Sequence, residues 1–259
     1  MHSPSCAKLV IAPTTSWAAS TQVAAVRNKL IWNYAHDSGT HVTDWGDAQG
    51  LVTNQASNGA KFLWNIVDKN GRPIANEDVP LNALFFNTGA AVIDSSSDVE
   101  VAYNYFHACY GEQIEFGPND VQACTNNRVH HNIFDMRTLA FSEHTPPRVI
   151  HCLVTVTDPA LGMDATNVAH NNLILLGDTF GQVGSGGQDS GVVHCRSASA
   201  AGADKEITFK NNVVVGSPQG QYPAIYMLRA TSNGYPHFTI HAEGNRFVDI
   251  GNVAVFMDF

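Results

Sequence analysis

The chain has 259 residues, of which 44% are apolar and only 14% are charged, and its formal net charge is −9 at pH 7. This negative charge argues against a nucleic-acid-binding protein, because such proteins need a basic surface. No apolar run approaches the ~20 residues that a membrane-spanning helix requires, so we expect no membrane span. The five cysteines include no Cys-x-x-Cys pair, so we expect no zinc site, and no residue is assigned as a metal ligand.

The first 28 residues have no clear periodicity and are rich in Pro, Thr, Ser and Ala, which predicts an N-terminal arm or partial cap. Residues 29–34 are the first clear strand. The polar stretch that follows contains His36, Asp37, His41, Asp44 and Asp47. Its spacing matches no metal-binding motif, so a polar turn is the favoured interpretation and a metal site the alternative. Residues 61–67 belong to the next coil, and the turn-rich segment 68–80 predicts an excursion.

One short motif recurs along the chain: a β-branched or aromatic residue, an Asn two or three places later, and then one to three apolar residues. The Asn residues are 32, 39, 28, 40, 40 and 33 positions apart; they are Asn33, Asn65, Asn104, Asn132, Asn172, Asn212 and Asn245. This uneven spacing argues against propeller blades and helical repeats, which have tighter periods. We expect Asn at a sharp bend for two reasons. It tolerates the left-handed conformation, and stacked amides can hydrogen-bond from coil to coil.

The segments 89–106, 127–134 and 206–215 resemble the right-handed parallel β-helix proteins of the pectate-lyase-like superfamily. The resemblance covers most of the chain from about Gly50 onward. It implies an all-β fold, a single-stranded right-handed parallel β-helix of roughly seven coils, as one solenoid domain over residues 29–259. That superfamily includes polysaccharide lyases, glycoside hydrolases, epimerases and viral tailspikes. The characteristic motifs of its pectate lyases, polygalacturonases and alginate epimerases are absent, so no catalytic residue can be transferred.

The most chemically suggestive pattern lies in a second set of predicted strands, within residues 91–94, 113–117, 149–156, 192–197, 224–229 and 253–258. Alternation along a strand separates inward from outward side chains. The outward column contains five groups suited to acid–base chemistry: Glu115, His151, His194, Arg196 and Tyr226. Such a column could remove the proton beside a uronic carboxylate and stabilise the enolate. We expect five further polar residues to contact substrate: Asp94, Gln113, Asp158, Asp189 and Arg229.

Two other interpretations of this face stay open. Two carboxylates among Asp94, Glu115, Asp158 and Asp189 would suit glycoside hydrolysis. The column could also be a polar ladder without chemistry. His130, His131 and His170 lie at the Asn turns, where we expect a structural role.

The sequence therefore predicts a carbohydrate-active protein, most simply a polysaccharide lyase or hydrolase, outside the cell or on a virus particle. The alternative is a non-catalytic glycan-binding or structural β-helix. No cofactor is expected with certainty, although Ca²⁺ could help to bind a polyanion.

The strand-like end of the chain, residues 253–259, predicts truncation or capping by a partner in a dimer or trimer. Cys109 and Cys124 could form a disulfide, whereas Cys152 and Cys195 are expected as buried thiols at matching positions.

Overall fold

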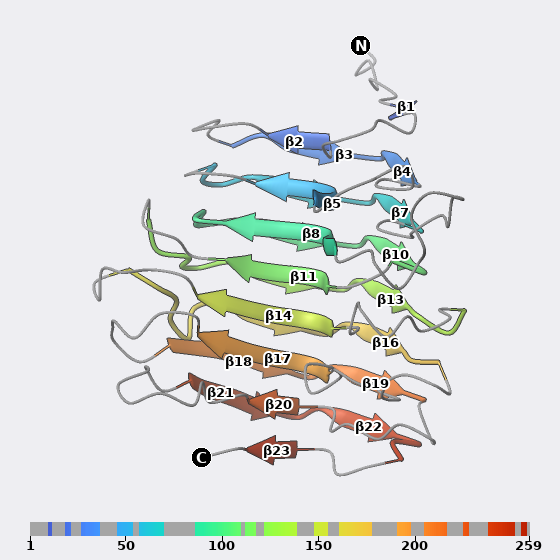
Figure 1. Cartoon of the computed structure of the whole chain (residues 1–259), viewed down its shortest axis with the longest axis vertical. Helices are drawn as coiled ribbons and strands as arrows, with labels where there is room; N and C mark the ends of the chain where they lie inside the picture. Colours follow the sequence, from blue (N-terminus) through green and yellow to red (C-terminus); the bar gives the residue numbers. More distant parts are fainter. Residues whose placement is uncertain are drawn as a thin grey trace, which may run out of the picture.

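The chain forms three parallel β-sheets whose strands stack along the long axis of the molecule in the computed structural model (Figure 1). Strands β1 and β2 lie at one end of the stack and β23 at the other. The structure describes residues 10–11, 19–21, 27–36, 46–53, 57–69, 86–109, 112–117, 122–138, 148–154, 161–177, 191–197, 205–216, 225–227, 238–251 and 255–257.

Each coil of the chain contributes one strand to each sheet. Sheet A contains β1 (Val10–Ile11), β4 (Tyr34–His36), β7 (Ile66–Asp68), β10 (Tyr105–His107), β13 (Ile133–Asp135), β16 (Leu173–Leu175), β19 (Val213–Val215) and β22 (Arg246–Val248). Sheet B contains β2 (Ala19–Thr21), β5 (Gly46–Thr53), β8 (Phe86–Asp94), β11 (Glu112–Gly117), β14 (Arg148–Val154), β17 (Gly191–Ser197), β20 (Ile225–Met227) and β23 (Val255–Met257). Sheet C contains β3 (Lys29–Ile31), β6 (Lys61–Leu63), β9 (Glu100–Ala102), β12 (Arg128–His130), β15 (Val168–His170), β18 (Lys205–Lys210) and β21 (Phe238–Glu243).

Every strand pairs in parallel with the strand three places away in sequence, as β10 does with β7 and β13. This connectivity is compatible with a parallel β-helix, and the predicted all-β repeat architecture is confirmed for the described residues. No helix that could cross a membrane is found among them. Strands β1 and β2 extend sheets A and B into the segment that the sequence suggested as an arm or cap.

The core consists of one inward side chain from each short strand, because alternation turns the middle residue of a three-residue strand inward. In sheet A these residues include Val67, Phe106, Phe134 and Ile174, all fully buried. The rings of Phe106 and Phe134 stack with centroids 5.0 Å apart. Strand β11 differs from the strands of sheets A and C, since consecutive residues from Glu112 to Phe116 are buried. Both of its faces are therefore covered.

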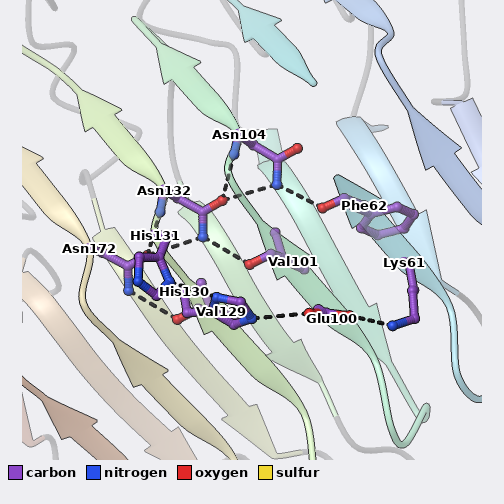
Figure 2. A network of polar contacts seen from close by, with 10 residues as sticks. All are labelled: Lys61, Phe62, Glu100, Val101, Asn104, Val129, His130, His131, Asn132 and Asn172. Atoms are coloured by element: carbon purple, nitrogen blue, oxygen red, sulfur yellow. Dashed lines mark hydrogen bonds and ion pairs between the residues drawn. The ribbon is translucent and has the colours of Figure 1, made fainter. Parts of the chain in front are cut away.

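The predicted amide ladder is confirmed. The side-chain Nδ2 of each Asn donates to Oδ1 of the Asn in the next coil over 2.9–3.1 Å, from Asn33 through to Asn245. The same oxygen also accepts the backbone N–H of the preceding ladder Asn, as Asn132 does from Asn104. Each interior amide donates once more to a sheet C carbonyl, as Asn132 Nδ2 does to Val101 O over 2.9 Å (Figure 2).

The prediction that these Asn residues adopt the left-handed conformation is wrong. The residue immediately before each ladder Asn adopts positive φ instead, between 54° and 63°: Trp32, Trp64, Tyr103, His131, Asn171, Asn211 and Gly244. This residue makes the bend from sheet C to sheet A, and the Asn that follows can then turn its amide inward. The left-handed conformation is shared by every described corner of this kind, so it is a property of the fold and not a sign of local function.

The two cysteine predictions have different outcomes. Cys152 and Cys195 are buried free thiols opposite one another on β14 and β17, as predicted. Burial raises the pKa of the Cys152 thiol. Cys109 and Cys124 are also free and buried, so the suggested disulfide between them is wrong. Instead, the Cys109 thiol donates to Val67 O, and the Cys124 thiol donates to Ile93 O.

Candidate functional site

The predicted catalytic column on sheet B is aligned at the level of the backbone. Glu115 is paired with His151, His151 with His194, and His194 with Tyr226, across four neighbouring strands. Arg196 lies two residues further along β17, opposite Leu153. The register therefore brings four of the five predicted residues into one row. Asp94, from the predicted substrate-binding set, is opposite Gly117 on the adjacent strand.

The described side chains of this row are buried, which differs from the open groove expected from the sequence. Glu115 is 6% exposed, and Gln113 and His194 are fully buried. Gln113 donates through Nε2 to Cys109 O over 2.8 Å, so this amide has a partner within the protein. The side chains of Asp94, His151, Arg196 and Tyr226, and the whole of Asp158, Asp189 and Arg229, are outside the described part of the structure. Their proposed roles stay predictions.

A second group of ionisable side chains lies on the outer side of sheet C and is shown in Figure 2. Lys61 Nζ contacts Glu100 Oε2 at 2.5 Å, and the other Glu100 oxygen is 3.2 Å from His130 Nε2. His130 Nδ1 is in turn 2.9 Å from Nδ1 of His131. We call these four residues the imidazole chain. They come from three consecutive coils, and Lys61 and Glu100 are direct register partners on β6 and β9.

Electrostatics fix the protonation of the buried part of this chain. The hydrogen bond from Lys61 is the main reason that the pKa of Glu100 lies below its ordinary value. Burial is the main cause that lowers the pKa of His130, against the opposing hydrogen bond from Glu100. Burial also lowers the pKa of the neighbouring His170 to about 4, with further lowering by His130 and His131. Glu100 is therefore ionised at neutral pH, and His130 and His170 are uncharged.

These protonation states fix the donor-to-acceptor direction of the hydrogen bonds in the imidazole chain. Ionised Glu100 can only accept, so His130 Nε2 carries the hydrogen and donates to it. Neutral His130 must then accept at Nδ1, and His131 Nδ1 is the donor. A neutral His131 consequently has its lone pair on Nε2. Since His131 is an exposed residue, the chain fixes a proton-accepting tautomer at the surface.

Stacked rings lead along the corner to His131. Trp32 stacks on Trp64 with centroids 5.3 Å apart, Trp64 on Tyr103 at 4.4 Å, and Tyr103 on His131 at 5.3 Å. We call these four residues the corner ladder. Trp32 is 63% exposed, Trp64 44% and Tyr103 41%. Because the rings stack face to face, their edges form most of the surface that the ladder offers to solvent.

Basic residues lie beside Glu100 and the histidines of the imidazole chain, although the protein as a whole is acidic. Lys61 and Arg128 are the register partners of Glu100 on either side, and Lys210 follows His130 and His170 in the next column. Arg128 is exposed, and Lys210 is half-buried. Within the described residues, no three His, Cys, Asp or Glu side chains form an arrangement that could hold a metal ion. This corner therefore combines stacked aromatic rings with basic side chains around the Glu100 carboxylate.

Comparison with known proteins gives no match. No protein-family model matches the chain, and no curated protein or solved structure matches it either. The fold defines the class of protein as an all-β protein of parallel coils, and the comparisons add no superfamily to that description.

The predicted structural role of His130 and His131 did not include a link to Glu100. The sequence spacing does contain a signal for the column of charged residues beside His130. Lys61, Glu100 and Arg128 each lie four residues before a ladder Asn, so aligning the coils on Asn65, Asn104 and Asn132 places their side chains in one column.

Proposed function

We propose that the chain is a right-handed parallel β-helix protein, of roughly seven coils and similar to the pectate-lyase-like superfamily, that cleaves an acidic polysaccharide by β-elimination. His131 is the proposed base. The observation that carries this proposal is the directed imidazole chain, which fixes the His131 tautomer with its proton-accepting Nε2 at an exposed corner. The polysaccharide would lie along the corner ladder, with its sugar rings against the aromatic edges.

The chemistry follows from the groups present. His131 Nε2 would remove the proton from the carbon beside the uronic carboxylate, and the adjacent carbon–oxygen glycosidic bond would break. Arg128 and Lys210 would attract the carboxylate and stabilise the negative charge that develops on it. Water would supply a proton to the departing sugar oxygen. Glu100 would favour the imidazolium formed in the first step through His130, because its charge is opposite.

The row Glu115, His151, His194 and Tyr226 is a second candidate location for the same reaction. Its support is the register that aligns these four residues across neighbouring strands. Burial of Glu115 and His194 favours the exposed His131 corner over this row as the place where a polymer binds.

A non-catalytic glycan-binding or structural protein is the alternative function. The face-to-face stacking of the corner ladder favours the structural form of this alternative, because the ring faces that would stack on sugars are largely used within the ladder. A straight, regular surface of this kind also suits a fibre or adhesin.

A panel of acidic and neutral polysaccharides tests the proposed function. Ultraviolet absorbance would detect unsaturated uronides, and a reducing-end assay on the same samples would detect hydrolysis. The proposal expects an absorbance increase with at least one acidic polysaccharide. Reducing ends without absorbance would favour hydrolysis by paired carboxylates. Retention of a glycan on the folded protein, without either product, would favour the binding function.

A further inference from the structure

A separate polar row lies on the outer side of sheet A. The last residues of β4, β7, β10 and β13 are register partners, and they alternate in type: His36, Asp68, His107 and Asp135. The middle residue of each of these strands points into the core, so the last residue is on the outer side. The row is independent of the imidazole chain, which is on sheet C.

Three groups of this region are arranged as an acid, a base and a hydroxyl. Asp68 Oδ1 is 2.7 Å from His107 Nδ1, and His107 Nε2 is 3.4 Å from the Thr138 hydroxyl. The carboxylate accepts the Nδ1 hydrogen, which leaves the Nε2 lone pair directed at the hydroxyl. The second contact is longer than the first, as is common in catalytic sites without substrate, where such hydrogen bonds tighten in the reacting complex.

Neighbouring residues hold these groups in place. The Tyr34 hydroxyl donates to Asp68 Oδ2 over 3.2 Å, so both oxygens of Asp68 are engaged. The ring of Tyr105 stacks on that of His107, with centroids 5.7 Å apart and planes inclined by 16°. The Tyr105 hydroxyl in turn donates to Asp135 Oδ2 over 3.0 Å. The imidazole is therefore oriented both through its nitrogen and through its ring face, which is what a preorganised base requires.

The residue before Thr138 is cationic. Arg137 precedes Thr138 in the chain and is bound to Asp135 through Nε at 2.9 Å and Nη2 at 2.7 Å. Neither of these two bonds uses its Nη1 group, and the side chain is 60% exposed. A guanidinium beside a nucleophile can stabilise negative charge that develops on a carbonyl oxygen.

We propose that Asp68, His107 and Thr138 form a catalytic triad that hydrolyses carboxylic esters. Thr138 Oγ1 attacks the ester carbonyl carbon while His107 Nε2 takes the hydroxyl proton, and His107 then returns that proton to the departing alkoxide. Water next attacks the acyl-threonine, gives one proton to His107 and releases the carboxylic acid, after which the proton returns to Thr138 Oγ1. We assign an ester group on a polymer as the substrate class, because the Thr138 nucleophile is exposed and the His107 side chain beside it is 27% exposed. The exposed side chains of Ile66 and Ile133, in the adjacent column of sheet A, would contact its acyl group.

The chain supplies a matched control for this proposal. His241 Nε2 is 3.0 Å from Glu206 Oε2 on the outer side of sheet C, so it is also an exposed histidine paired with a carboxylate. Among the described residues, the polar contact of His241 is with that carboxylate, and no hydroxyl takes part in the pair. Background hydrolysis by a surface imidazole would occur at His241 as readily as at His107.

The test combines p-nitrophenyl acetate hydrolysis with labelling by a fluorophosphonate, both on the full-length protein, followed by peptide mapping. We expect the label on Thr138, and we expect T138V and H107N to lose at least about 100-fold in hydrolysis rate. T138S should keep both activity and label, and H241N should behave as the unmodified protein. Equal melting temperatures would show that T138V and H107N are folded.

Three results would overturn the triad. They are the absence of label at Thr138, an unchanged hydrolysis rate in T138V, and a loss in H241N as large as that in H107N. The assay is also separate from the elimination assay, because it reads ester cleavage and not unsaturated uronides. Failure of one proposal therefore leaves the other intact.

Discussion

At the scale of single residues, the ladder Asn residues have the clearest energetic role. Asn132 is 1% exposed, donates to Val101 O and Asn172 Oδ1, and accepts from both nitrogens of Asn104. Replacing it by Leu removes four hydrogen bonds and leaves buried groups without partners, each of which costs roughly 1–3 kcal/mol.

We therefore predict that N132L lowers the free energy of unfolding by at least about 3 kcal/mol. Denaturant unfolding would measure the change. Asn171 is the matched control, because it is exposed at the adjacent corner with a φ of 54°, a conformation that Gly adopts readily. N171G should change stability by less than about 1 kcal/mol. Equal effects of the two substitutions would refute the role assigned to the buried amide.

His170 gives a prediction about pH. Its pKa falls from an ordinary 6.5 to about 4 in the folded protein, so the unfolded state binds more protons between these two values. Stability from this residue is present above pH 6.5 and is lost as the pH falls toward 4. We expect the melting temperature to fall over this interval and to fall less in H170Q. An identical pH dependence in the two proteins would contradict the assigned pKa.

At the scale of the elements, the connections between strands differ in how much they tolerate a side chain. Gly216 follows β19 with a φ of +107°, and an added Cβ would lie 2.5 Å from the backbone oxygen of Leu176. Gly244 occupies a bend where other coils carry Trp, Tyr, His or Asn, and the obstacle there is the Asn211 side-chain oxygen. Backbone cannot move aside as a surface side chain can.

We predict that G216A destabilises the protein by about 1–3 kcal/mol and that G244A costs clearly less. Thermal unfolding of both variants would compare them. A larger cost for G244A than for G216A would contradict this assignment.

The turns between sheets C and A are predictable from the sequence because their pattern repeats. Each turn keeps an Asn followed by apolar residues, and that local pattern survives variable loop lengths. The left-handed residue was assigned to the wrong position because Trp, Tyr and His rarely adopt this conformation. A second amide contact, from Asn127 to Asn167, was missed because it joins only two coils.

The candidate site was less predictable for a different physical reason. Alternation distinguishes the inside of a coil from its outside, but it does not reveal whether other segments cover the outside. Glu115 and His194 therefore aligned as expected and yet are buried. The contact between His130 and Glu100 depends on the register between coils that are separated by 28 residues at their Asn positions. This contact can be predicted only after the coils have been aligned.

At the scale of the whole molecule, binding of an acidic polymer must overcome a formal net charge of −9. The proposed attraction is therefore local, through Arg128 and Lys210, and salt should screen it because Arg128 is exposed and Lys210 is only half-buried. We predict that glycan affinity falls with added sodium chloride and falls again in R128Q at low salt. Affinity measurements at two salt concentrations would test this, and salt-independent binding would count against it.

The most direct test of the proposed function is the elimination rate of H131Q on the acidic polysaccharide that the panel identifies, compared with H194Q and H241Q. Loss of a general base predicts a decrease in kcat of at least about 100-fold in H131Q, with near-normal rates in H241Q and in H194Q that remains folded. A large loss in folded H194Q with normal activity in H131Q would contradict this account and move the reaction to sheet B.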